Sequence, residues 1–148
     1  MPDTAADLLL ECLAEALHTF AFIAAEPPAG PVPAPAVADL YTLRFAGRVS
    51  GEFQLAAPRE LGGLMAANLL GLEPTDAQAA HSAEDVLKEL CNITAGLWLQ
   101  RRAADDLPEM GLPAARPLAD WDRFAAQPGS FAVLADGYPL VAHLEEMP

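Results

Sequence analysis

Two neighbouring stretches of alternating polar and apolar residues restrict the folds open to this chain more than any other feature. They span residues 37–46 and 48–57 and are separated by a single glycine, Gly47. The alternating apolar positions are Tyr41, Leu43 and Phe45 in the first stretch and Val49, Phe53 and Leu55 in the second. A period of two predicts β-strands, and the glycine predicts a tight hairpin between them. The chain should therefore contain an antiparallel sheet.

Helical spacing of apolar residues surrounds this hairpin. It predicts a first helix over residues 3–25 and a second from Pro58 to Leu70, closed by Gly71. A third helix is expected from Ser82, as its N-cap, to about residue 104.

A second hairpin is predicted near the end of the sequence, with strands over residues 131–134 and 140–144 around Asp136-Gly137. Residues 105–129 have no clean period, although 112–118 favour a short edge strand. The order of elements predicts an α+β fold, a two-layer α/β sandwich whose mostly antiparallel sheet carries its helices on one face.

Five prolines fall within residues 27–35 and exclude regular structure there. The chain before them is too short to form a core of its own. Residues 27–36 are therefore interpreted as a proline-rich surface loop, and residues 1–148 as a single domain.

Charge excludes several classes of function. The chain has 8 basic and 21 acidic residues, a net charge of −13, which disfavours nucleic acid and anionic membranes as partners. The first basic residue is Arg44, so no secretory signal is indicated, and no charge-free apolar stretch reaches membrane-spanning length. We therefore expect a cytoplasmic protein.

Cysteine and histidine do not predict a metal site or a disulfide framework. Cys12 and Cys91 lie among apolar residues of predicted helices, where buried free thiols are the expected state. His18, His81 and His143 are too far apart in the sequence to suggest a metal-binding set.

The third predicted helix contains a stripe of residues that a helix does not favour. Asp85, Glu89, Asn92 and Gly96 are four, three and four residues apart and so share one face. The two carboxylates repel each other, and asparagine and glycine both have poor helix propensity. Several local costs along one line indicate a functional surface.

Each residue of the stripe also has an ordinary interpretation. Asp85 is placed to complete a capping box with Ser82. Glu89 is a possible surface carboxylate, and Asn92 a possible partner for a loop or for water. Gly96 would also suit close packing against another helix.

A carboxylate and a carboxamide one helical turn apart contain no nucleophile, but they can position other groups. The carboxamide both donates and accepts hydrogen bonds and can orient a water, and the carboxylate can hold a cation on a partner. In-line attack of water on an acyl phosphate or phosphoanhydride is a reaction that needs little more than such positioning.

The segment Asp85-Val-Leu-Lys-Glu89-Leu-Cys-Asn92 matches the signature Asp or Ser-x3-Glu-x2-Asn of the CheC/CheX/FliY phosphatases of bacterial chemotaxis, and the chain resembles that family. The segments 51–61, 69–71 and 92–96 extend the resemblance. A single full motif makes the chain most similar to the CheX branch. Members of that branch have one active site and form homodimers, and each subunit has a pseudo-twofold fold. Asp7 and Glu11, followed by Ala14, are interpreted either as a faded second motif or as an ordinary acidic helix face.

The resemblance implies a phosphatase that dephosphorylates a phosphorylated CheY-like response regulator. It implies that Asn92 orients the attacking water and that Glu89 pairs with the regulator's active-site lysine. Asp85, Lys88 and Gly96 would belong to the partner-binding surface. The magnesium ion and the aspartyl phosphate would both belong to the partner, so no cofactor of the chain's own is expected.

Two other functions compete with this one. The first is a non-catalytic interaction module that binds a response regulator or a flagellar switch component through the same stripe. The second, a stand-alone small-molecule hydrolase, has little support, because the sequence contains no Gly-x-Ser-x-Gly, His-Glu-x2-His or Walker motif.

Overall fold

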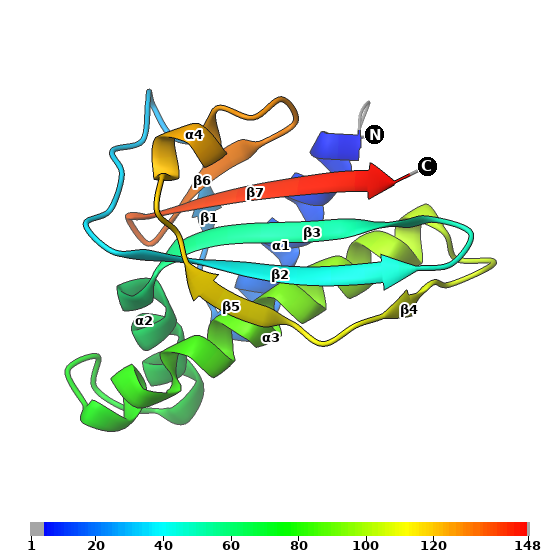
Figure 1. Cartoon of the computed structure of the whole chain (residues 1–148). Coiled ribbons are helices and arrows are strands. Elements are labelled where there is room, and N and C mark those ends of the chain that lie inside the picture. Colours follow the sequence, from blue (N-terminus) through cyan, green and yellow to red (C-terminus); the bar gives the residue numbers. More distant parts are fainter. Residues whose placement is uncertain (1–4, 148) are drawn as a thin grey trace.

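A computed structural model describes residues 5–147 of the chain, which contain four helices and seven strands (Figure 1). The helices are α1 (Ala5–Ala21), α2 (Arg59–Leu70), α3 (Ala77–Arg102) and α4 (Trp121–Ala125). The strands are β1 (Ala25–Glu26), β2 (Ala38–Ala46), β3 (Ser50–Pro58), β4 (Glu109–Met110), β5 (Ala114–Pro117), β6 (Phe131–Ala135) and β7 (Tyr138–Met147).

The strands form one antiparallel sheet in the order β1-β6-β7-β3-β2, and both β4 and β5 pair with the outer edge of β2. Helix α1 is followed by β1, β2 and β3, and α3 is followed, after the two-residue strand β4, by β5, β6 and β7. Exchanging these two sets of strands reverses the sheet order without changing which strands are neighbours. The predicted pseudo-twofold α/β sandwich is therefore confirmed, with the axis between β3 and β7.

Helices α1, α2 and α3 lie together on one face of the sheet (Figure 1). The main core is formed between this helical layer and the sheet, and its largest side chains include Trp98, Tyr41, Phe53, Leu13 and Leu17. The three long helices thus occupy one face, as predicted.

The short helix α4 departs from the prediction, because it covers part of the opposite face. Trp121 and Phe124 pack there against Leu40, Ala56 and Val141 of the sheet. A helix of five residues is too short to show an apolar period, so its position is set by burial of the two aromatic rings.

Helix α3 begins earlier than predicted. Its N-cap is Asp76, whose side chain accepts a hydrogen bond of 2.8 Å from the backbone N–H of Gln78, and Ser82 lies within the helix. The prediction of Ser82 as N-cap was wrong because Ala79 and Ala83 are both buried, and their burial extends the helix toward Asp76.

Other predicted boundaries differ by a few residues. The β2–β3 and β6–β7 hairpins are confirmed, as is an edge strand within residues 112–118, which is β5. Residues 27–37 contain no helix or strand. The predicted start of the first helix at residue 3 lies outside the described residues. No helix within residues 5–147 is long and apolar enough to cross a membrane.

Helix α1 ends four residues before its predicted end, in a strained conformation. The backbone N–H of Ile23 donates to the carbonyl of Leu17, six residues earlier, at 3.1 Å, and Phe22 adopts a φ of +60°. This left-handed position favours glycine, and Phe22 is 71% exposed, so its ring gains little from burial.

We expect Phe22→Gly to raise the free energy of unfolding by about 1 kcal/mol, because it removes the steric cost of a side chain in the left-handed region. Urea unfolding of the wild type and the variant measures the change. Phe22→Ala is the matched control, since it removes the ring but keeps the strain. Equal gains in both variants would attribute the effect to the ring and contradict the prediction.

Candidate functional site

The predicted stripe lies on the exposed side of α3. The opposite side of the helix is buried against the sheet and the other helices and includes Leu87, Leu90, Cys91, Thr94 and Trp98. Asp85 and Glu89 are exposed, and Asn92 and Gly96 are half-buried. With a rise of about 1.5 Å per residue, Glu89 and Asn92 lie about 4.5 Å apart along the helix axis. All four residues can therefore meet one partner surface.

The side chains of Asp85, Glu89 and Asn92 make no hydrogen bond or ion pair within residues 5–147. The capping-box interpretation of Asp85 is wrong, because the helix begins nine residues earlier at Asp76 and Ser82 is an interior residue. Asn92 likewise does not bind a neighbouring loop in the described part of the chain. The three polar groups remain available to a partner or to water.

Gly96 is not a helix-packing glycine. A β-carbon built at this position would have no heavy atom within 4 Å, outside the helix's own backbone and the adjacent residues. Gly62 on α2 is the contrasting case, since its β-carbon would lie 2.6 Å from the carbonyl oxygen of Ala83. Gly62 is therefore the glycine that allows α2 to pack closely against α3. Gly96 leaves an open position beside Asn92.

Lys88 lies at the flank of the stripe and forms an ion pair with Glu84, with Nζ and Oε2 3.2 Å apart. Its side chain is 32% exposed and that of Glu84 is 48% exposed. A pair this exposed contributes little to stability, typically about 0.3–0.5 kcal/mol for this helical spacing. Lys88 can therefore exchange Glu84 for a carboxylate or phosphate of a partner at small cost.

The cysteines do not supply a nucleophile to this surface. Cys12 and Cys91 are buried free thiols, as predicted. Burial raises the pKa of the thiol of Cys91, the residue that precedes Asn92 in the helix. Burial also raises the pKa of Cys12, although the nearby Arg101 guanidinium opposes the change. Both thiols stay protonated at neutral pH, so positioning is the chemistry that the stripe can perform.

No three histidine, cysteine, aspartate or glutamate side chains within the described range are grouped so that they could hold a metal ion. The stripe itself offers only two carboxylates and one carboxamide on a convex helix face.

The first helix presents a related face. Because the internal twofold exchanges α1 and α3, the exposed Asp7 and Glu11 lie on the structural counterpart of the helix that contains Asp85 and Glu89. Ala14, the counterpart of Asn92 by spacing, has no carboxamide. The α1 face therefore lacks the group that could orient a water.

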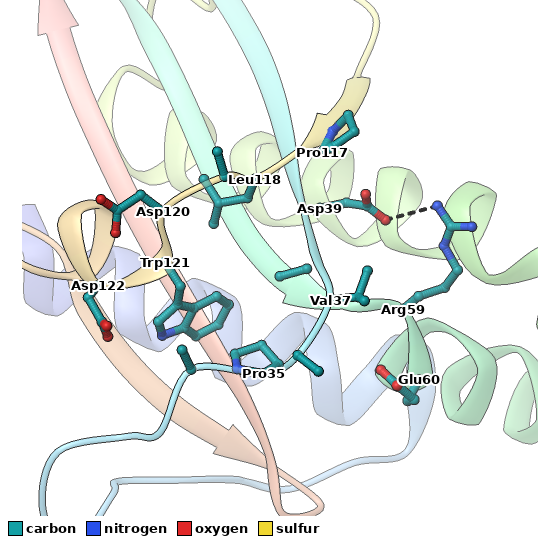
Figure 2. Close-up of a pocket in the computed structure, with 14 residues that line it drawn as sticks. Pro35, Val37, Asp39, Arg59, Glu60, Pro117, Leu118, Asp120, Trp121 and Asp122 are labelled. Carbon is teal, nitrogen blue, oxygen red and sulfur yellow. Dashed lines mark hydrogen bonds and ion pairs between the residues drawn. The ribbon is translucent and has the colours of Figure 1, made fainter.

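A hollow that was not predicted from the sequence lies elsewhere, between the start of β2, the start of α2 and the loop before α4. It has a volume of about 690 Å³. Asp39 is 6% exposed and accepts a hydrogen bond of 3.1 Å from Nη2 of Arg59, while Trp121 and Asp122 line the other side (Figure 2). Its residues come from three distant segments, so no local motif marks it.

Comparison with known proteins places the fold. Residues 41–115 match the family described as chemotaxis phosphatase CheX. No curated protein matches the chain in sequence.

Several solved structures share the fold. A protein of Desulfovibrio vulgaris Hildenborough has a TM-score of 0.72 at 12% identity and covers 99% of both chains. The chemotaxis protein CheX of Desulfovibrio desulfuricans has a TM-score of 0.70 at 11% identity, covering 97% of this chain and 99% of its own. The CheX of Borrelia burgdorferi, solved with CheY, BeF3 and Mg²⁺, has a TM-score of 0.63 at 19% identity, covering 98% and 99%. At these identities the likeness establishes the fold alone.

Proposed function

The chain belongs to the CheX family of chemotaxis phosphatases, and we propose that it hydrolyses the aspartyl phosphate of a phosphorylated CheY-like response regulator. The observation that carries the proposal is the unpartnered Glu89 and Asn92 pair on the exposed face of α3. A carboxylate and a carboxamide that make no hydrogen bond within the described residues can form hydrogen bonds with another molecule.

Asn92 acts on the attacking water. Its amide oxygen accepts a hydrogen bond from the attacking water and its amide nitrogen donates to a regulator oxygen, so that the water is held in line with the phosphorus–oxygen bond that breaks. Phosphoryl transfer gains chiefly from such positioning and from charge stabilisation. Asn92 is half-buried, which limits its rotamers and favours one orientation.

Glu89 acts on the partner. Its exposed carboxylate pairs with a lysine beside the regulator's phosphorylation site and fixes the register of the two proteins. Asp85 and Lys88 extend the same contact by one turn, and Gly96 lets the regulator's backbone approach α3 closely because nothing occupies the position of its missing side chain.

The magnesium ion and the aspartyl phosphate are assigned to the regulator. The net charge of −13 opposes approach of a phosphorylated surface, so the metal ion and the regulator's lysine provide the local attraction. The Borrelia burgdorferi relative, solved with CheY and Mg²⁺, supports a regulator of this kind as the partner. The homodimer implied by the resemblance stays a prediction.

The test is phosphate release from a magnesium-loaded, phosphorylated CheY-type regulator with and without the chain. We expect acceleration by the wild type and about tenfold weaker regulator binding by Glu89→Gln, which removes the charge but keeps the shape. Glu73→Gln, an exposed carboxylate outside α3, is the matched control and should leave both binding and turnover unchanged.

Two results would separate the alternatives. Binding without any acceleration, across several regulators of the same cell, would support the non-catalytic interaction module. Acceleration with equal effects of Glu89→Gln and Glu73→Gln would retain the phosphatase but remove Glu89 from its site.

A further inference from the structure

Within the described residues, most basic side chains of this acidic chain are paired with a carboxylate, but two arginines on the face of the sheet opposite α3 are not. Five of the eight basic side chains form ion pairs within residues 5–147: Arg44, Arg59, Lys88, Arg101 and Arg102. Among these described residues, Arg48, Arg116 and Arg123 have no acidic partner. In a chain with 21 acidic residues, two unpaired arginines at one place are unexpected.

Arg116 and Arg123 line the same hollow, whose volume is about 300 Å³. Arg116 lies on β5, where its cross-strand partner on β2 is Leu40. Cross-strand partners point to the same face of a sheet, and Leu40 packs against α4. Arg116 therefore points to the α4 side, opposite α3, and Arg123 lies on α4 itself.

The other walls of the hollow are suited to the organic group of a small molecule. Leu40, Pro117, Leu118 and Phe124 supply apolar surface, and Gln54 and Gln127 supply amides. Gln54 lies on this face because it pairs with Thr42, two residues along β2 from Leu40. A hollow of this size is at the lower end of small-molecule sites, roughly 300–1,000 Å³.

One carboxylate also lines the hollow, and its charge opposes an anion. Asp120 caps α4, and its Oδ1 accepts a hydrogen bond of 3.0 Å from the backbone N–H of Arg123. This bond holds one carboxylate oxygen at the helix end. Among the residues that line the hollow, two guanidinium groups outnumber one carboxylate. The nearby Glu52, which accepts a hydrogen bond of 2.6 Å from Nε2 of Gln54, is paired with Arg44.

We propose that this hollow, between β5 and α4, binds a small organic phosphate, with Arg116 and Arg123 holding the phosphate oxygens and the apolar floor holding the organic group. Guanidinium groups present planar pairs of donors that match phosphate oxygens. The site is independent of the phosphatase surface, because α3 lies on the other face of the sheet (Figure 1).

Calorimetric titration of the full chain with phenyl phosphate at low ionic strength tests the proposal, with inorganic phosphate as the probe for the anion alone. We expect saturable binding of phenyl phosphate, weaker binding of inorganic phosphate, and about a tenfold loss of affinity in each of Arg116→Gln and Arg123→Gln. Arg48→Gln, the third unpaired arginine, lies outside the hollow and should bind as the wild type does.

Three outcomes would overturn the proposal: no saturable binding by the wild type, an equal loss in Arg48→Gln, or binding that survives both substitutions in the hollow. Both arginines are exposed, so the variants should fold, and unchanged thermal unfolding in the absence of ligand checks this. Dephosphorylation of a regulator should be unchanged in Arg116→Gln and Arg123→Gln, which separates failure here from failure of the proposed phosphatase.

Discussion

Replacing Asn92 with alanine should reduce the acceleration of phosphate release by about 100-fold or more while leaving regulator affinity within about threefold. The reason is that the carboxamide is expected to position the water in the transition state and to contribute little to ground-state binding. A loss confined to turnover is the kinetic signature of such a group. Single-turnover decay of the phosphorylated regulator, at saturating concentrations of the chain, measures it.

The structure offers a close control for this experiment. Gln100 is an exposed carboxamide on the same helix, two turns beyond Asn92, and Gln100→Ala should leave turnover unchanged. Folding of Asn92→Ala is not at issue, because the Asn92 side chain makes no hydrogen bond within residues 5–147 and alanine is the better helix former. Full activity of Asn92→Ala would refute the proposed role, whatever the regulator used.

The candidate site was accessible from the sequence because it lies on one helix. The spacing of Asp85, Glu89 and Asn92 fixes them to one face without any knowledge of the rest of the fold. The sequence did not determine whether each residue had a structural role instead, such as helix capping, a hydrogen bond to a loop or close helix packing. Only the tertiary structure shows that Asp85 is remote from the helix start and that a β-carbon at Gly96 would meet no neighbouring element.

The hairpins and the three long helices were also predictable, since each is set by a local period and by local turn residues. The start of α3 was not, because Asp76 and Ser82 are both acceptable N-caps and the choice depends on burial of Ala79 and Ala83. Where two local N-cap signals are equally good, tertiary packing determines where the helix begins.

The short elements β1, β4 and α4 were not predicted at all. Strand β1 contains two residues and is defined by its pairing with β6, more than 100 residues later. Helix α4 depends on Trp121 and Phe124 meeting the sheet. The hollows around α4 share this origin, because their residues come together only when distant segments pair.

Gly62→Ala and Gly96→Ala should change stability in opposite directions, although both glycines are helical. At Gly62 the new β-carbon would lie 2.6 Å from the carbonyl oxygen of Ala83 and 2.8 Å from Cδ1 of Leu87. Helices α2 and α3 would have to separate, at a cost of about 1–3 kcal/mol. At Gly96 nothing is displaced, and alanine should add about 1 kcal/mol through helix propensity. Urea unfolding of both variants measures the two changes.

A larger side chain at Gly96 then separates stability from function. Gly96→Leu should fold at least as stably as the wild type, because leucine is a better helix former than glycine and its β-carbon would meet no heavy atom within 4 Å outside the adjacent residues and the helix's own backbone. It should nevertheless bind the regulator at least tenfold more weakly, since it occupies the position through which the partner approaches the helix. Unchanged affinity of Gly96→Leu would show that the partner does not contact α3 at this turn. A loss of affinity in a variant that is fully folded has no explanation in the chain's own packing, so it would identify Gly96 as part of the docking surface.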